Sequence, residues 1–201
     1  MRCLVDRGAR LDLEEQECFY TPLALALALK NEWVASELLL SSSQSSSSSS
    51  LRSAVNLNQI AFQLSPRIGS SPMLLAVKFG LTAIIRQVYD LSLQIGNAPL
   101  DWNQPVYVWT DGTNVNDPVR KSMIHVALEN DQLDVLSLLL EIGVDVNKVN
   151  EFGDTPLLTA LIKGAEAAAC LLLRAGTRVD IPSPHLGRFP MYALCLYFLL
   201  I

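Results

Sequence analysis

The residues best suited to chemistry in this sequence are two histidines and four cysteines. A zinc site needs several such side chains at close spacing, and a catalytic thiol or hydroxyl needs a base beside it. His125 and His185 lie far apart, and no CxxC pair occurs among the cysteines, which are Cys3, Cys18, Cys170 and Cys195. The sequence also lacks a nucleophile elbow, a P-loop and an HExxH motif. We therefore expect no enzyme, no metal site and no cofactor.

The composition describes a chain that can bury a core and carries a mild negative charge. Half of its 201 residues are hydrophobic, and the formal net charge is −5. An apolar content this high excludes disorder throughout, and a negative balance disfavours a nucleic-acid surface or an anionic membrane. The N-terminus lacks an apolar signal-peptide core, and no Asn-x-Ser/Thr site occurs. We expect reduced cysteines and a cytoplasmic location.

A short motif recurs along the chain and sets the frame for these residues. The copies read TPLALA from Thr21, SPMLLA from Ser71, SMIHVA from Ser122 and TPLLTA from Thr155, with a degenerate copy, FPMYAL, from Phe189. The last two intervals, 33 and 34 residues, agree with a repeat of about 33 residues and the signature T-P-L-H-x-A. The chain therefore resembles the ankyrin repeat family. The resemblance implies an all-α solenoid of stacked helix–turn–helix units with short β-hairpin fingers.

The motif divides the chain into units. We expect a partial repeat at 1–15 and a degenerate partial repeat at 184–201, which together suggest a fragment of a larger protein. Full repeats are expected at about 16–56, 66–101, 117–149 and 150–183. Helices are expected near 22–30, 34–40, 72–79, 83–90, 123–130, 133–140, 156–163 and 166–173.

The residue types of the motif have physical roles in such a unit. The Ser or Thr can cap the first helix, with proline in its first turn, where the missing N–H costs nothing. The motif's alanine, as in Ala127 and Ala160, allows neighbouring helices to approach closely. The leucine triplets 38–40, 138–140 and 171–173 are expected to bury the second helix between repeats. Gly8, Gly143 and Gly176 follow that helix at positions suited to a left-handed residue.

Two insertions lengthen the array. Residues 41–53 form a Ser-rich segment that we expect to be disordered, as either a phosphorylation segment or, as we favour, a tolerated low-complexity expansion. Residues 98–117 are expected to form an elongated finger, with a hairpin at 105–116 that turns at Asp111-Gly112. The aromatic residues Trp102, Tyr107 and Trp109 either bind a partner or fold back over the repeats.

His125 occupies the histidine position of the repeat signature. The resemblance implies a structural role in which its ring ties the turn together by hydrogen bonds. We therefore interpret it as a structural residue and not as a catalytic base.

The resemblance also implies where a partner would bind. Ankyrin partners usually lie along a concave groove lined by finger tips and the exposed face of the first helix of each unit. Transferred to this chain, these positions are Tyr20, Arg67, Ile68, Lys78, Phe79, Trp109, Glu129, Asn130, Glu151, Phe152, Asp154, Ile162 and Lys163. We expect a scaffold or adaptor that binds a protein or peptide and no nucleic acid. The alternative is the cytosolic ankyrin region of a membrane protein such as a channel, in which 191–201 begins a transmembrane segment.

Overall fold

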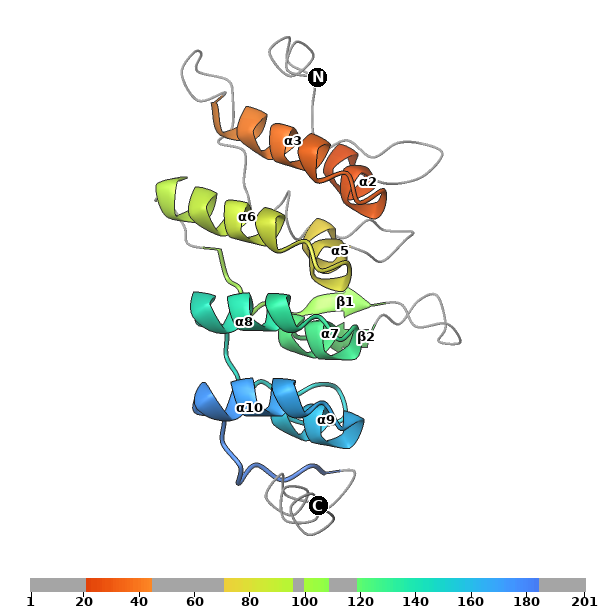
Figure 1. Ribbon diagram of the computed structural model, residues 1–201, viewed down its shortest axis with the longest axis vertical. Coiled ribbons are helices and arrows are strands. Elements are labelled where there is room, and N and C mark those ends of the chain that lie inside the picture. The colour runs from red at the N-terminus through yellow and green to blue at the C-terminus, as the bar shows by residue number, and fades with distance from the viewer. Residues whose placement is uncertain (1–20, 45–70, 96–99, 109–118, 185–201) are drawn as a thin grey trace. The chain divides into compact units, whose positions relative to one another are not determined.

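The computed structural model describes residues 21–44, 71–95, 100–108 and 119–184. The chain divides into two compact units, one comprising Met1–Asp101 with Tyr107–Pro118 and the other Trp102–Val106 with Val119–Ile201. The described part of each unit contains two helix pairs in the order first helix, turn, second helix (Figure 1). The partial repeat predicted at 1–15 and nearly all of the degenerate repeat at 184–201 lie outside the described residues.

In the described part of the first unit, two helix pairs pack so that first helix contacts first helix and second helix contacts second helix. Helix α2 (Pro22–Ala28) pairs with α3 (Glu32–Gln44), and α5 (Pro72–Lys78) pairs with α6 (Thr82–Ile95). Between the pairs, α2 contacts α5 and α3 contacts α6. This is the stacking that repeats of one type adopt when each covers the apolar face of its neighbour.

The second unit repeats this arrangement. Helix α7 (Met123–Glu129) pairs with α8 (Leu133–Ile142), and α9 (Pro156–Lys163) pairs with α10 (Glu166–Arg174). Again α7 contacts α9 and α8 contacts α10. Two short strands, β1 (Val106–Val108) and β2 (Val119–Lys121), form a two-stranded sheet that precedes α7. The predicted all-α repeat fold, with little strand and that strand in a finger, is confirmed.

The starts of the first helices follow from the repeat motif. Thr21, Ser71 and Thr155 each precede a proline, and the side-chain oxygen of each accepts the backbone N–H three positions later at 3.2 Å. Such a cap satisfies one of the N–H groups that a helix start leaves without a partner. Ser122 makes no such bond, and its hydroxyl bonds to the ring of His125.

The second helices of the last two repeats end as predicted at glycines with a left-handed backbone. Gly143 has φ of 89° and caps α8, and Gly176 has φ of 81° just after α10. Glycine adopts this conformation without the steric cost of a Cβ atom. Gly8 lies outside the described residues.

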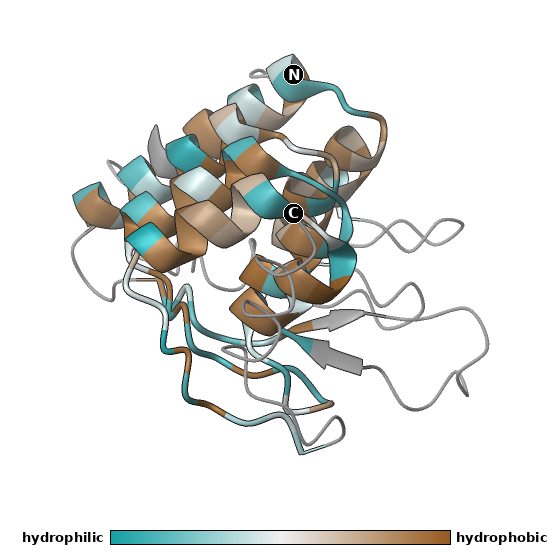
Figure 2. Cartoon of the chain, turned by 60° about the horizontal axis from the view of Figure 1, so that its bottom comes forward, coloured by the Kyte–Doolittle hydropathy of each residue, from teal (hydrophilic) through white to brown (hydrophobic). Residues whose placement is uncertain are grey.

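The core lies between the helices of neighbouring repeats. Ala127, Ala160, Leu139 and Leu172 are fully buried, as the motif predicts. The leucine triplets are only partly buried, however, and Leu173 is 39% exposed. Three consecutive helical residues point in different directions, so a triplet cannot face one neighbour as a whole. Figure 2 shows hydrophobic residues grouped along the helices, with hydrophilic residues at many helix ends.

The serine-rich insertion begins differently from the prediction. Helix α3 continues through Ser41 to Gln44, so the first residues of the serine run are helical and the prediction of disorder from residue 41 is wrong there. Adding a residue to an existing helix is inexpensive, and serine is only a moderately poor helix former. The remainder of the run, 45–53, lies outside the described residues.

The finger insertion differs in its register. Its second strand, Val119–Lys121, begins after the predicted hairpin at 105–116 has ended. Trp102 is 7% exposed, which supports packing against the protein over partner binding for this aromatic residue.

We expect Leu139→Ala and Leu172→Ala each to lower the free energy of unfolding by about 2–5 kcal/mol, because each leaves a cavity at a fully buried position. Leu173→Ala is a matched control on the same helix as Leu172, and its partial exposure predicts a loss below about 1 kcal/mol. Urea denaturation monitored by circular dichroism measures all three. Equal losses at Leu172 and Leu173 would contradict this packing.

Candidate functional site

The structure describes nine of the thirteen predicted groove residues. Tyr20, Arg67, Ile68 and Trp109 lie outside the described residues. Two of the nine belong to the first unit and seven to the second.

In the first unit, the predicted pair Lys78 and Phe79 lies at the end of α5. Lys78 is exposed, whereas Phe79 is half-buried. The ammonium group of Lys30, from the turn after α2, lies 5.0 Å from the centre of the Phe79 ring. A cation over an aromatic face is an attractive contact, so one face of this ring is already used within the protein.

In the second unit, His125 links the third repeat to the fourth. Its Nδ1 atom lies 2.7 Å from Ser122 Oγ, and its Nε2 atom lies 3.1 Å from the backbone oxygen of Asp154. Asp154 precedes the cap of α9, so the ring connects the starts of two first helices. Burial of the ring lowers the pKa of His125 from 6.5 to about 4. The predicted structural role is confirmed, and a neutral, enclosed imidazole with both nitrogens bonded is a poor catalytic base.

Lys163, predicted to face a partner, instead bonds to the third repeat. Its ammonium group donates to the backbone oxygens of Leu128 at 2.6 Å and Glu129 at 3.1 Å, and to Asp131 Oδ1 at 2.8 Å. The carbonyl groups at a helix end have no partner within the helix and carry partial negative charge. Lys163 therefore caps the C-terminal end of α7 from the neighbouring repeat.

Two further predicted residues, both on the third repeat, bond within that repeat. The Lys121 ammonium group pairs with the Glu129 carboxylate at 2.7 and 2.9 Å. The side-chain amide of Asn130 donates to the backbone oxygen of Val126 at 2.8 Å. These polar groups hold β2 and the end of α7 together, so they are less available to a partner than their positions in the sequence suggest.

The finger before α9 is ordered by one side chain that the sequence analysis missed. Asn150 Oδ1 accepts the backbone N–H groups of Phe152 at 3.0 Å and Asp154 at 2.8 Å. Asparagine commonly bonds to backbone groups just ahead of it in a turn, and the nearby Gly153 was the available signal. The turn leaves Glu151 and Phe152 exposed and Asp154 half-buried.

The apolar side chains that remain outward are the most informative of the predicted set. Phe152 is 53% exposed in the finger, and Ile162 is 59% exposed on α9. Both belong to the fourth repeat, where the neighbouring Lys163 is already bonded. The fourth repeat therefore exposes Phe152 next to Glu151 in the finger and Ile162 on α9.

Within the described residues, no group of three or more His, Cys, Asp or Glu side chains could hold a metal ion. Among the helices that the structure describes, none has the length and apolar character needed to cross a membrane.

The lowered pKa of His125 predicts how stability depends on pH. Between pH 6.5 and about 4 the unfolded chain binds a proton at this ring and the folded chain does not, so stability falls as the pH falls through this range. The full loss is roughly 3 kcal/mol. Chemical denaturation from pH 7 to 4.5 should show most of this loss, with a shallower dependence for His125→Asn. NMR titration of the ring gives an independent check, and a value near 6.5 in the folded chain would contradict the burial argument.

The bonds of Lys163 predict an unequal effect for the two partners of its ion pair. Lys163→Met keeps the aliphatic stem but removes the bonds to two backbone oxygens, and we expect a loss of about 1–3 kcal/mol in stability. Asp131→Asn removes only a pair whose acid is 76% exposed, and we expect a loss below about 1 kcal/mol. Thermal and urea denaturation compare the two. Equal losses would mean that the carboxylate, and not the carbonyl groups, dominates.

The comparisons with known proteins agree with this geometry. A family model described as ankyrin repeats (3 copies) matches residues 103–183. The chain is 32% identical over 71 residues to the transient receptor potential cation channel subfamily A member 1 of Homo sapiens, a match that covers 35% of this chain and 6% of the channel. It is 40% identical over 60 residues to the ADP-ribosylation factor GTPase-activating protein AGD2 of Arabidopsis thaliana, covering 30% of this chain and 8% of that protein.

This chain thus matches under a tenth of the length of each of these relatives. Ankyrin repeats generally mediate protein–protein interaction and are typically non-enzymatic binding modules. The stacked helix pairs, the capped motif and the bonds of His125 all fit this family. Residues 103–183 are therefore identified as ankyrin repeats.

Proposed function

We propose that the chain is an interaction scaffold or adaptor that binds a partner protein or peptide through the groove and fingers of its repeats. The exposed pair Phe152 and Ile162 is the observation that carries this proposal. Large apolar side chains left outward on a finger and a first helix cost solvation free energy that a partner would recover on binding. Aromatic residues in particular are enriched at the centres of interfaces.

The paired lysines of the second unit support a partner with apolar anchors over a polyanion. Lys121 and Lys163 are each paired with a carboxylate of the protein, from Glu129 and Asp131. A nucleic-acid surface needs lysines or arginines that can neutralise phosphates. The net charge of −5 further weakens that interpretation.

We place this activity in the cytoplasm. Cys170 is exposed and free, and an exposed thiol is maintained more readily in a reducing compartment.

A second candidate function is the ankyrin region of a membrane channel. The similarity to a human cation channel favours it, although the segment 191–201 that would begin a membrane helix lies outside the described residues. The two functions predict different sequences beyond residue 201 in a longer chain. An apolar run continuing to roughly twenty residues would support the channel, and further repeats would support the adaptor.

Affinity capture with quantitative mass spectrometry tests the proposal, using the full chain as bait. The test variants are Phe152→Ser and Ile162→Ser, and the control is Leu173→Ser, which replaces an apolar residue that is 39% exposed on α10. A genuine partner should be retained by the control and reduced about 5–30-fold by each test variant, the range for loss of an interface anchor.

Thermal denaturation should show that all three variants remain folded. Partners that are captured equally by all versions, or lost equally with the control, would contradict binding through Phe152 and Ile162.

A further inference from the structure

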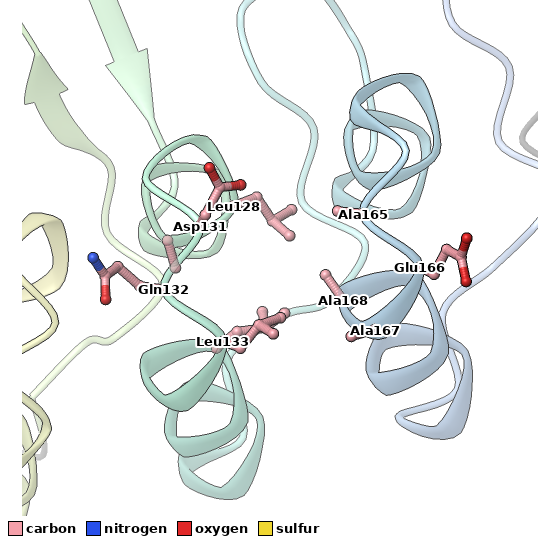
Figure 3. Close-up of a pocket in the computed structure, with 10 residues that line it drawn as sticks. Leu128, Asp131, Gln132, Leu133, Ala165, Glu166, Ala167 and Ala168 are labelled. Atoms are coloured by element: carbon pink, nitrogen blue, oxygen red, sulfur yellow. The ribbon is translucent and has the colours of Figure 1, made fainter.

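A second apolar surface lies at the turns between helices in the second unit, at the opposite end of α7 and α9 from the fingers. It is a groove of about 160 Å³ whose walls include Ala127, Leu128, Leu133, Leu136, Ala165 and Ala168. Figure 3 shows Leu128 and Leu133 pointing across the gap toward Ala165 and Ala168 at the start of α10. We call this surface the turn groove.

The turn groove exists because the fourth repeat is small at a position where the others are large. Thirteen residues after the motif's Ser or Thr, the other repeats carry Val34, Ile84 and Val135, and the fourth carries Ala168. Ile84, Val135 and Ala168 are all buried. The shorter side chain leaves space beside α10 that an isoleucine or valine fills elsewhere.

One wall of the turn groove carries an apolar residue at a position that is polar in the other three repeats. Eleven residues after the motif's Ser or Thr, the repeats carry Glu32, Thr82, Leu133 and Glu166. Leu133 is 41% exposed. Leu133 is thus an exposed apolar residue at a position that is polar in the other repeats. It lies next to a space that a larger side chain fills in those repeats. Together these differences indicate a surface suited to an apolar group.

The size of the turn groove selects the occupant. A cavity of about 150 Å³ lined by aliphatic and aromatic side chains is large enough to bind benzene. A volume of about 160 Å³ therefore accommodates one leucine or phenylalanine side chain.

The charged residues around the turn groove indicate what kind of chain segment should carry the bound apolar side chain. The two charged residues that line it, Asp131 and Glu166, are both acidic, and Asp134 follows Leu133 on α8. Lys163 balances one of them through its pair with Asp131. Three carboxylates against one ammonium group give this surface a net negative formal charge, which favours a cationic group beside the apolar one.

We propose that the turn groove binds one leucine or phenylalanine side chain from a basic segment of a partner protein. It forms a second docking point between the third and fourth repeats, separate from Phe152 and Ile162. Its occupancy does not depend on whether those two residues also bind a partner.

The probe is the capped tripeptide Arg-Phe-Arg, titrated into the ¹⁵N-labelled full chain and followed by NMR. We expect saturable shifts of the amide signals of residues 127–136 and 165–168. The capped tripeptides Glu-Phe-Glu and Arg-Ala-Arg, which lack the charge and the ring respectively, should bind at least about tenfold more weakly.

Ala168→Val restores the side chain found at this position in the first and third repeats. It should leave the thermal midpoint unchanged or raised and should weaken the Arg-Phe-Arg peptide at least about tenfold by filling the groove. Leu133→Ala, at an exposed site, removes one wall and should weaken binding about fivefold without affecting folding. Asp131→Asn keeps the backbone, because asparagine also tolerates the left-handed conformation at φ of 54°. It removes only charge and leaves the apolar walls intact, so it should weaken binding less than either of the other variants.

The proposal is overturned if the tripeptide causes no saturable shifts, if Ala168→Val and Leu133→Ala bind it as the unaltered chain does, or if the acidic tripeptide binds equally well. Shifts confined to the signals of Phe152 and Ile162 would also overturn it, while supporting the proposed function. Conversely, shifts at the turn groove that survive Phe152→Ser and Ile162→Ser support the turn groove whatever the outcome for the finger surface.

Discussion

The structure of each unit depends on the burial of an apolar face that a single helix pair cannot cover alone. Leu139 and Leu172 are fully buried on second helices that pack both on the first helix of their own repeat and on the second helix of the neighbouring repeat. Ala127 and Ala160 play the matching role between the first helices, where a larger side chain would hold the helices apart. Capping, turns and fingers are all arranged around this stacking, and none of them would be stable without it.

Stacking also determines what the polar residues can do. His125 was expected to tie its own turn together and Lys163 to face a partner, and both bond to the neighbouring repeat. Their polar atoms are therefore part of the contact that holds the repeats together. On the fourth repeat, Phe152 and Ile162 are the large apolar side chains that stay exposed among the predicted groove residues, and the proposed function is based on them.

The sequence was sufficient for everything governed by local rules. The helices begin where Thr21, Ser71 and Thr155 precede proline, and α8 ends at Gly143, because capping depends on residues close together in the chain. It was insufficient where the outcome depends on another element. The end of α3 at Gln44 and the register of β2 were missed because helix continuation and strand pairing are weakly encoded.

The candidate site shows the same division between local and distant effects. Exposure of Phe152 and Ile162 followed from their positions in the repeat, whereas the bonds of Lys163 join residues more than thirty positions apart. Comparing the four copies of the motif could have singled out Ala168 and Leu133 as unusual. Predicting a groove, however, required knowing that these two residues face each other across a repeat boundary.

The bonds between the third and fourth repeats have a consequence for how such a protein can diverge. His125 reaches the backbone oxygen of Asp154, and Lys163 reaches those of Leu128 and Glu129. A backbone oxygen is present whatever residue occupies the position, so the side chains at 129 and 154 can change without removing these bonds. Substitution at 129 and 154 can therefore change the chemistry of this surface while the bonds between the two repeats remain.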